Sequence, residues 1–140
     1  GQPEPYGYGK TVSLPTLLSR RLPKERVLSD MFRVGWVSAA AMLVRRQVFQ
    51  MLDGFDPDFF MYWEDVDFCY RARLAGVNVA VVPKARAIHQ RGHSSSLTRQ
   101  KTTWYDQSAD RYFRKHYSKP VWLFHRLLRT IYRFWQPQVW

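Results

Sequence analysis

Carboxylates gather in one short stretch of this sequence, between Asp53 and Asp67. Six of the eleven acidic residues of the 140-residue chain lie there. The same stretch holds six large apolar residues: Phe55, Phe59, Phe60, Met61, Tyr62 and Trp63. Because side chains of this kind must pack, we expect some of the carboxylates at the edge of a partly buried cleft. Burial shifts carboxyl pKa values, and groups in such places act as acids and bases.

The end of this stretch is predicted to begin a helix that runs from near Tyr62 to Ala75, with acidic residues in its first turn and basic residues nearer its end. At about 100° per residue, Glu64 and Asp65 point in different directions, and Asp67 lies nearly opposite Asp65. They cannot all serve one site. Asp65 is either a general base or a plain helix-start residue, and Asp67 is expected to be structural, paired with Arg71.

The neighbouring segments predict an α/β layer. Residues 34–45 are nearly continuously apolar and are interpreted as a buried strand, in which the small residues Ser38 to Ala41 let another group approach the backbone. Residues 47–52 predict a short helix that ends at Asp53 and Gly54. Residues 77–82 predict a second buried strand, and residues 85–88 a further short strand.

A polar loop with two histidines follows at residues 89–96. A neutral imidazole at His89 can reach a metal ion, with His93 as the alternative ligand, although a lone histidine is more often simply packed or solvated. Arg91 either pairs with a phosphate group or is a solvated loop residue.

The C-terminal part is basic and aromatic. Residues 103–117 have helical spacing, and Pro120 separates them from a last helix. In that helix one stripe is apolar (Leu123, Leu127, Ile131 and Phe134) and another is basic (Arg126, Arg129 and Arg133). The basic stripe is interpreted as a solvated face, a membrane-surface contact or a nucleic-acid contact.

The overall composition is that of a globular domain with a formal net charge of +11, which favours an anionic partner. Cys69 is the only cysteine, so an internal disulfide and a cysteine-based zinc site are excluded. No apolar run approaches the roughly 18 residues that a spanning helix needs, so we expect a soluble or peripheral protein.

Several motifs, in order, resemble those of family 2 glycosyltransferases, and in particular the rhamnosyltransferase-like members that build bacterial cell-surface polysaccharides. The resemblance covers the chain from about Arg33 to Tyr117. Its motifs are Val37-Ser38-Ala39-Ala40-Ala41-Met42-Leu43-Val44-Arg45-Arg46, Gly54-Phe55-Asp56, Phe59-Phe60-Met61-Tyr62-Trp63-Glu64-Asp65-Val66-Asp67 and His89-Gln90-Arg91-Gly92-His93-Ser94.

The resemblance implies a partial GT-A fold, a Rossmann-like layer of mixed strands and helices, here with amphipathic helices at the C-terminal end. It implies inverting transfer from a nucleotide-diphospho-sugar to a saccharide or lipid-linked acceptor at the cytoplasmic face of the membrane, with a divalent metal, Mg²⁺ or Mn²⁺, on the diphosphate. Asp65 matches the general base and His89 the metal-binding histidine. The expected acceptor-side residues are Ser38, Tyr62, Trp63, Glu64 and Arg91. The alternatives are a place in the core for Tyr62 and Trp63, tight packing for Ser38 and a plain surface role for Glu64.

Two features depart from the family pattern. Asp53 stands where the family usually has the first of two glycines before Phe-Asp, and the nucleotide-binding half with its Asp-x-Asp motif is absent from these residues. We therefore expect residues 1–32 to be a lead-in, 33–97 the acceptor-side half of the transferase domain and 98–140 a basic helical extension. The alternatives are a truncated inactive fragment and a non-catalytic module for anionic membranes or, less consistently with the clustered acid, nucleic acid.

Overall fold

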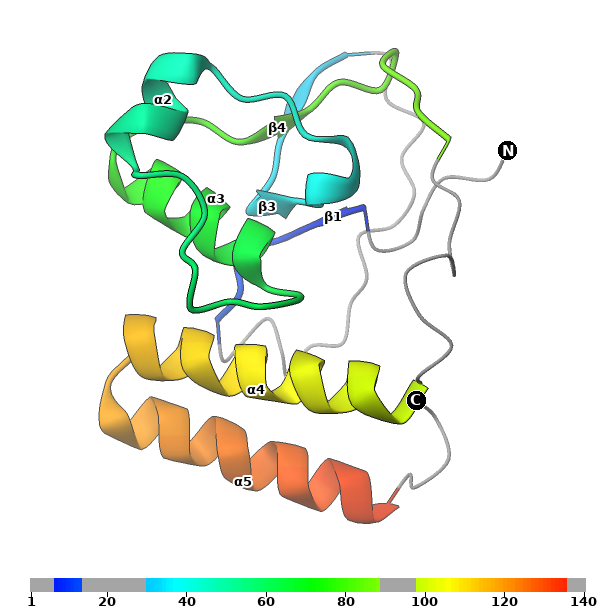
Figure 1. Cartoon of the computed structure of the whole chain (residues 1–140), viewed down its shortest axis with the longest axis vertical. Helices are drawn as coiled ribbons and strands as arrows, with labels where there is room; N and C mark the ends of the chain where they lie inside the picture. Colours follow the sequence, from blue (N-terminus) through cyan, green and yellow to red (C-terminus); the bar gives the residue numbers. More distant parts are fainter. Residues whose placement is uncertain (1–6, 14–29, 89–97, 136–140) are drawn as a thin grey trace. The chain divides into compact units, whose positions relative to one another are not determined.

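The computed structural model describes residues 7–13, 30–88 and 98–135 (Figure 1). They form two-residue strands, one 3-10 helix and four α-helices, which confirms the expected mixture of α and β structure. The chain divides into two compact units. We call Gly1–Asp56 with Glu64–Gln90 the strand unit, and Pro57–Trp63 with Arg91–Trp140 the helical unit.

Two antiparallel strand pairs form the sheets of the strand unit. β1 (Tyr8–Gly9) pairs with β3 (Trp36–Val37), and β2 (Phe32–Arg33) pairs with β4 (Ala80–Val81). Glycine is required at position 9, because a Cβ atom there would lie 2.4 Å from Nε1 of Trp36. The close approach of the Trp36 ring thus depends on a residue without a side chain.

The predicted buried strand at residues 34–45 is wrong for most of its length. Strand pairing ends before Ser38, whose hydroxyl oxygen accepts a hydrogen bond from the N–H of Ala40 at 3.3 Å. This bond caps a 3-10 helix, η1 (Ala39–Ala41), and such local side-chain bonds compete with the ladder of a strand. Leu43, further along the same apolar run, is fully exposed. A continuous apolar run here does not mark continuous burial.

The second predicted strand is shorter than expected. Only Ala80 and Val81 of residues 77–82 are in β4, and both are half-buried. Residues 85–88 form no strand, and the side chain of Ile88 is exposed.

Two helices flank the acidic stretch. α2 (Arg46–Met51) ends where Asp53 and Gly54 take positive φ values of 56° and 67°, as predicted from the Asp-Gly pair. α3 (Glu64–Leu74) packs against β3 (Figure 1). Its acidic residues lie in the first turn. It begins two residues later than predicted, because the two residues before it have left-handed backbone.

Arg71 forms a buried ion pair within α3 and also binds the loop that follows α2. Asp67 is fully buried, and its Oδ2 accepts a hydrogen bond from Nε of Arg71 at 2.7 Å, which confirms the predicted i, i+4 pair. The same guanidinium donates to the carbonyl of Leu52 at 2.6 Å and to that of Gly54 at 2.8 Å. Arg71 therefore joins the loop after α2 to the middle of α3.

The helical unit contains two helices that lie side by side and run in opposite directions (Figure 1). α4 (Thr98–His116) and α5 (Lys119–Trp135) confirm the two predicted helices. Pro120 lies in the first turn of α5, where the missing N–H costs nothing. Tyr112 and Phe113 of α4 are among the most deeply buried side chains and form the centre of this unit's aromatic core.

The basic stripe of α5 is not simply a solvated face. Arg129 lies 3.7 Å from Oδ1 of Asp106 on α4, and Arg126 lies 3.4 Å from Oδ1 of Asp110. At least two of its three arginines thus pair with the neighbouring helix. Within the described ranges, no helix combines the length and the apolar composition needed to cross a membrane.

Replacing Arg71 by methionine is expected to lower the free energy of unfolding by about 3 kcal/mol, because the buried carboxylate of Asp67 loses the positive charge of Arg71. Urea denaturation at neutral pH measures the loss. Arg46→Met, at an exposed position at the start of α2, is the matched control and should change stability by less than about 0.5 kcal/mol. Equal stabilities for the two variants would contradict a structural role for this pair.

Candidate active site

Asp65 lies in the first turn of α3 with its carboxylate held by backbone amides. The N–H of Ala39, in η1, donates to Oδ2 at 3.0 Å, and the N–H of Val66 donates to Oδ1 at 2.8 Å. The first bond joins residues that are 26 positions apart in sequence, and the second lies within the helix. They fix the orientation of the carboxylate on the strand unit.

The pKa of the Asp65 carboxyl is raised above its ordinary value of 3.8 because burial disfavours the charged form. The hydrogen bonds from Ala39 and Val66, with a smaller contribution from the Ser38 hydroxyl, act in the opposite direction but do not cancel the effect of burial. A carboxylate with a raised pKa takes up a proton more readily, which is the property that a general base needs.

The small residues at 38–41 allow this arrangement. Their lack of bulk was predicted to let another group approach the backbone, and the carboxylate of Asp65 does so at Ala39. Ser38 itself starts the turn that presents this N–H. The sequence alone does not specify this contact, although a Ser before Ala-Ala-Ala is a capping signal that favours a turn over a strand.

Glu64 is the half-buried neighbour of Asp65. Its Oε2 is buried and has no hydrogen-bond partner among the described residues. Burial raises the pKa of this carboxyl, and the nearby charge of Asp65 acts in the same direction. An unsatisfied buried carboxyl oxygen is costly, so Glu64 is suited to bind a polar group that the chain itself does not supply.

Tyr62 and Trp63 belong to the helical unit. Their φ values of 65° and 67° are in the left-handed region, which costs a residue with a side chain about 1–2 kcal/mol. No feature of the sequence indicates this strain. Trp63 is buried, and its ring lies 5.2 Å from that of Tyr112 between centroids, while the ring of Tyr62 lies 5.8 Å from that of Tyr105.

The other predicted site residues, His89, His93 and Arg91, lie outside the described residues. Within the described part of the chain, no three His, Cys, Asp or Glu side chains come close enough to hold one metal ion. Cys69 is buried, which raises the pKa of its thiol to about 11, so it is protonated at neutral pH and is no candidate nucleophile.

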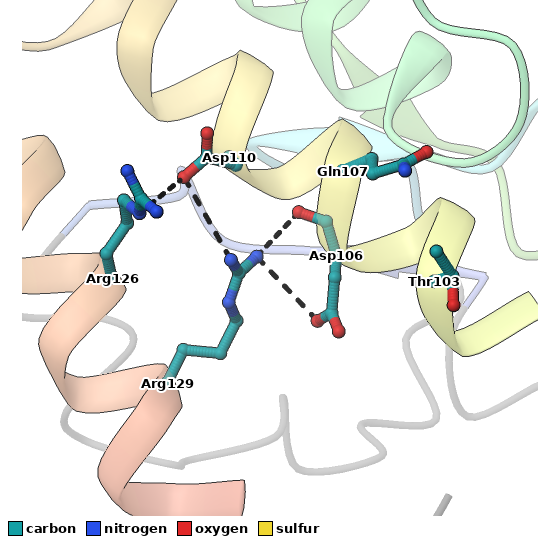
Figure 2. Close-up of a pocket in the computed structure, with 6 residues that line it drawn as sticks. All are labelled: Thr103, Asp106, Gln107, Asp110, Arg126 and Arg129. Atoms are coloured by element: carbon teal, nitrogen blue, oxygen red, sulfur yellow. Dashed lines mark hydrogen bonds and ion pairs between the residues drawn. The ribbon is translucent and has the colours of Figure 1, made fainter.

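A pocket of about 290 Å³ lies between α4 and α5 in the helical unit (Figure 2). Figure 2 shows Arg126 and Arg129 of α5 reaching toward Asp110 and Asp106 of α4. Oδ1 of Asp110 also lies 4.0 Å from Nη2 of Arg129. These opposite charges satisfy one another, so we interpret the pocket as part of the contact between the helices, and it contains none of the predicted site residues.

Comparison with known proteins assigns most of the strand unit, from residue 18 onward, and part of α4 to a family. Residues 18–107 match the family described as glycosyltransferase like family 2. The chain belongs to this family. The matched region contains Asp65 and Glu64, and the resemblance of the motifs to this family is confirmed.

The similar curated proteins are longer transferases. The rhamnosyltransferase WbbL of Escherichia coli K12 is 41% identical over 93 residues, which are 66% of this chain and 35% of that protein. An N-acetylglucosaminyl-diphospho-decaprenol L-rhamnosyltransferase of Mycobacterium tuberculosis is 42% identical over 72 residues, 51% of this chain and 24% of that protein. The chain thus spans about a third or less of these relatives, and no solved structure matches it.

Replacing Ala39 by proline is expected to raise the pKa of Asp65 further, because proline lacks the N–H that stabilises the charged form. The substitution suits the backbone, since position 39 starts a helical turn after an extended Ser38 with φ −70° and ψ 139°. Titration of the Asp65 carboxyl carbon by NMR, assigned with Asp65→Asn, measures the shift. Ala39→Gly keeps the N–H and should leave the pKa near that of the parent. An unchanged or lower pKa in Ala39→Pro would contradict this geometry.

Proposed function

We propose that this chain is the acceptor-side part of an inverting glycosyltransferase that uses a nucleotide-diphospho-sugar, with Asp65 as general base. The observation that supports the proposal most directly is the carboxylate of Asp65, oriented by two backbone N–H groups and given a raised pKa by burial. Family membership supports the class of reaction, and the geometry at Asp65 supports the role of this residue.

In the proposed step, the acceptor hydroxyl gives its proton to the carboxylate of Asp65 as the oxygen attacks the anomeric carbon of the donor sugar. The new glycosidic bond forms on one face of that carbon while the bond to the diphosphate breaks on the other, so the configuration inverts and a nucleoside diphosphate leaves. Glu64 is proposed to bind the acceptor through its unsatisfied carboxyl oxygen. Ser38, Tyr62, Trp63 and Arg91 remain proposed contacts of the substrates.

The donor side is proposed to come from a part of the transferase outside these 140 residues, in keeping with the greater length of the relatives. Two of the relatives are named rhamnosyltransferases, and the name of one of them specifies an N-acetylglucosaminyl-diphospho-decaprenol. We therefore propose a saccharide or lipid-linked acceptor and a location at the cytoplasmic face of the membrane. A GT-A-like, Rossmann-like arrangement of the whole domain belongs to the same proposal.

Replacing Asp65 by asparagine in the transferase that contains this chain is expected to lower kcat by about 10²- to 10⁴-fold with little change in KM, because an amide cannot accept the proton. Steady-state transfer from the nucleotide sugar measures the loss. Asp53→Asn is the matched control, since Asp53 is an exposed carboxylate of the same stretch and asparagine tolerates its positive φ. A kcat within a few-fold of the parent in Asp65→Asn would rule out the proposed role.

Family 2 glycosyltransferases generally use a divalent metal, and we propose His89 as a ligand. Among the described residues no cluster of three metal-binding side chains accompanies it. His89→Ala is expected to raise the Mn²⁺ concentration needed for half-maximal activity by about 10-fold or more, while His93→Ala leaves it near the parent value. The reverse order would assign the ligand to His93 instead.

A further inference from the structure

One face of α5 is apolar and exposed. Leu123, Phe124, Leu127 and Ile131 have exposed fractions of 47%, 43%, 56% and 47%. At about 100° per residue they fall within an arc of about 100° around the helix axis. These four residues, which we call the outer stripe, form a continuous apolar surface of the width that an amphipathic helix normally buries.

The opposite face of α5 is occupied by α4. Nε1 of Trp122 donates to Oδ1 of Asp110 at 2.9 Å, and the ring of His125 stacks on that of Phe113 with centroids 3.9 Å apart. His125 is buried, and Arg129 pairs with Asp106 in the same interface. Rotating α5 to bury the outer stripe would break these contacts, so within the described part of the helical unit the stripe has no cover.

The charges around the outer stripe indicate what covers it. After Asp110 the chain has seven basic and no acidic residues. The exposed Lys119 begins α5, and Arg126, on one flank of the stripe, keeps about half of its side chain exposed despite its pair with Asp110. An apolar stripe flanked by cations matches an anionic lipid surface, where acyl chains and phosphate groups are adjacent. A second copy of the helix would bring like charges together, and nucleic acid would leave the apolar side chains uncovered.

We propose that α5 lies along an anionic bilayer surface, with the outer stripe at the boundary between headgroups and acyl chains. The helix is too short and too polar to cross the membrane, so it lies in the plane of the surface. This inference rests on the proposed membrane location and deepens it by naming the contact surface. It would hold the helical unit at the membrane, where a lipid-linked acceptor is found.

Flotation of the purified 140-residue chain with vesicles tests the proposal. The parent chain is expected to bind vesicles that contain phosphatidylglycerol and to bind pure phosphatidylcholine vesicles much less. Leu127→Ser combined with Ile131→Ser should weaken binding roughly 10-fold or more, because two half-exposed apolar side chains no longer enter the bilayer. Leu74→Ser, at an exposed apolar position of α3, is the control and should bind like the parent.

Equal vesicle binding by the double variant and the parent chain would overturn the proposal. Equal binding of the parent chain to vesicles with and without phosphatidylglycerol would also overturn it. A dimer in sedimentation that the double variant dissociates would overturn it in favour of a second copy on the stripe. Salt-sensitive binding of RNA or DNA by the parent chain, lost in the double variant, would overturn the proposal in favour of nucleic acid as the partner of the outer stripe. Asp65→Asn should bind vesicles normally, so loss of the proposed catalytic role and loss of membrane binding are separate outcomes.

Discussion

The strand unit depends on the contacts that the guanidinium of Arg71 makes inside it. This guanidinium satisfies a fully buried carboxylate, that of Asp67, and two carbonyls at the end of α2, so three groups share one planar cation. A buried charge without such partners would be strongly destabilising. Because Asp67 and Asp65 lie in the same turn of α3, the contact that anchors the helix also sets where the carboxylate of Asp65 meets η1.

Asp65 experiences two opposing effects that together suit proton transfer. Its place at a helix start and the N–H groups of Ala39 and Val66 favour the charged form, while burial disfavours it and dominates. The result is a carboxylate with a raised pKa that is rigidly held. Glu64 beside it has an unsatisfied buried oxygen. In the function that we propose, the first carboxyl exchanges a proton while its neighbour binds a polar group of the substrate.

Much of this arrangement could be predicted from the sequence, and the rest depends on contacts between distant residues. The charge order of α3, the pair of Asp67 with Arg71 and the end of α2 follow from local spacing and were correctly predicted. The prediction of a strand over residues 34–45 was wrong because the Ser38 hydroxyl caps a turn there. The left-handed backbone at Tyr62 and Trp63 has no local signal, and the face of α5 that is covered depends on where Asp106 and Asp110 of α4 lie.

The pH dependence of kcat/KM for sugar transfer tests most directly whether Asp65 is the base. The rate should fall on the acid side with a slope of one and an inflection above the ordinary aspartate value of 3.8, because burial raises the pKa of Asp65 and only its deprotonated form accepts the proton. The residual activity of Asp65→Asn should lack this inflection. An identical acid limb in the parent and in Asp65→Asn would show that another group takes the proton.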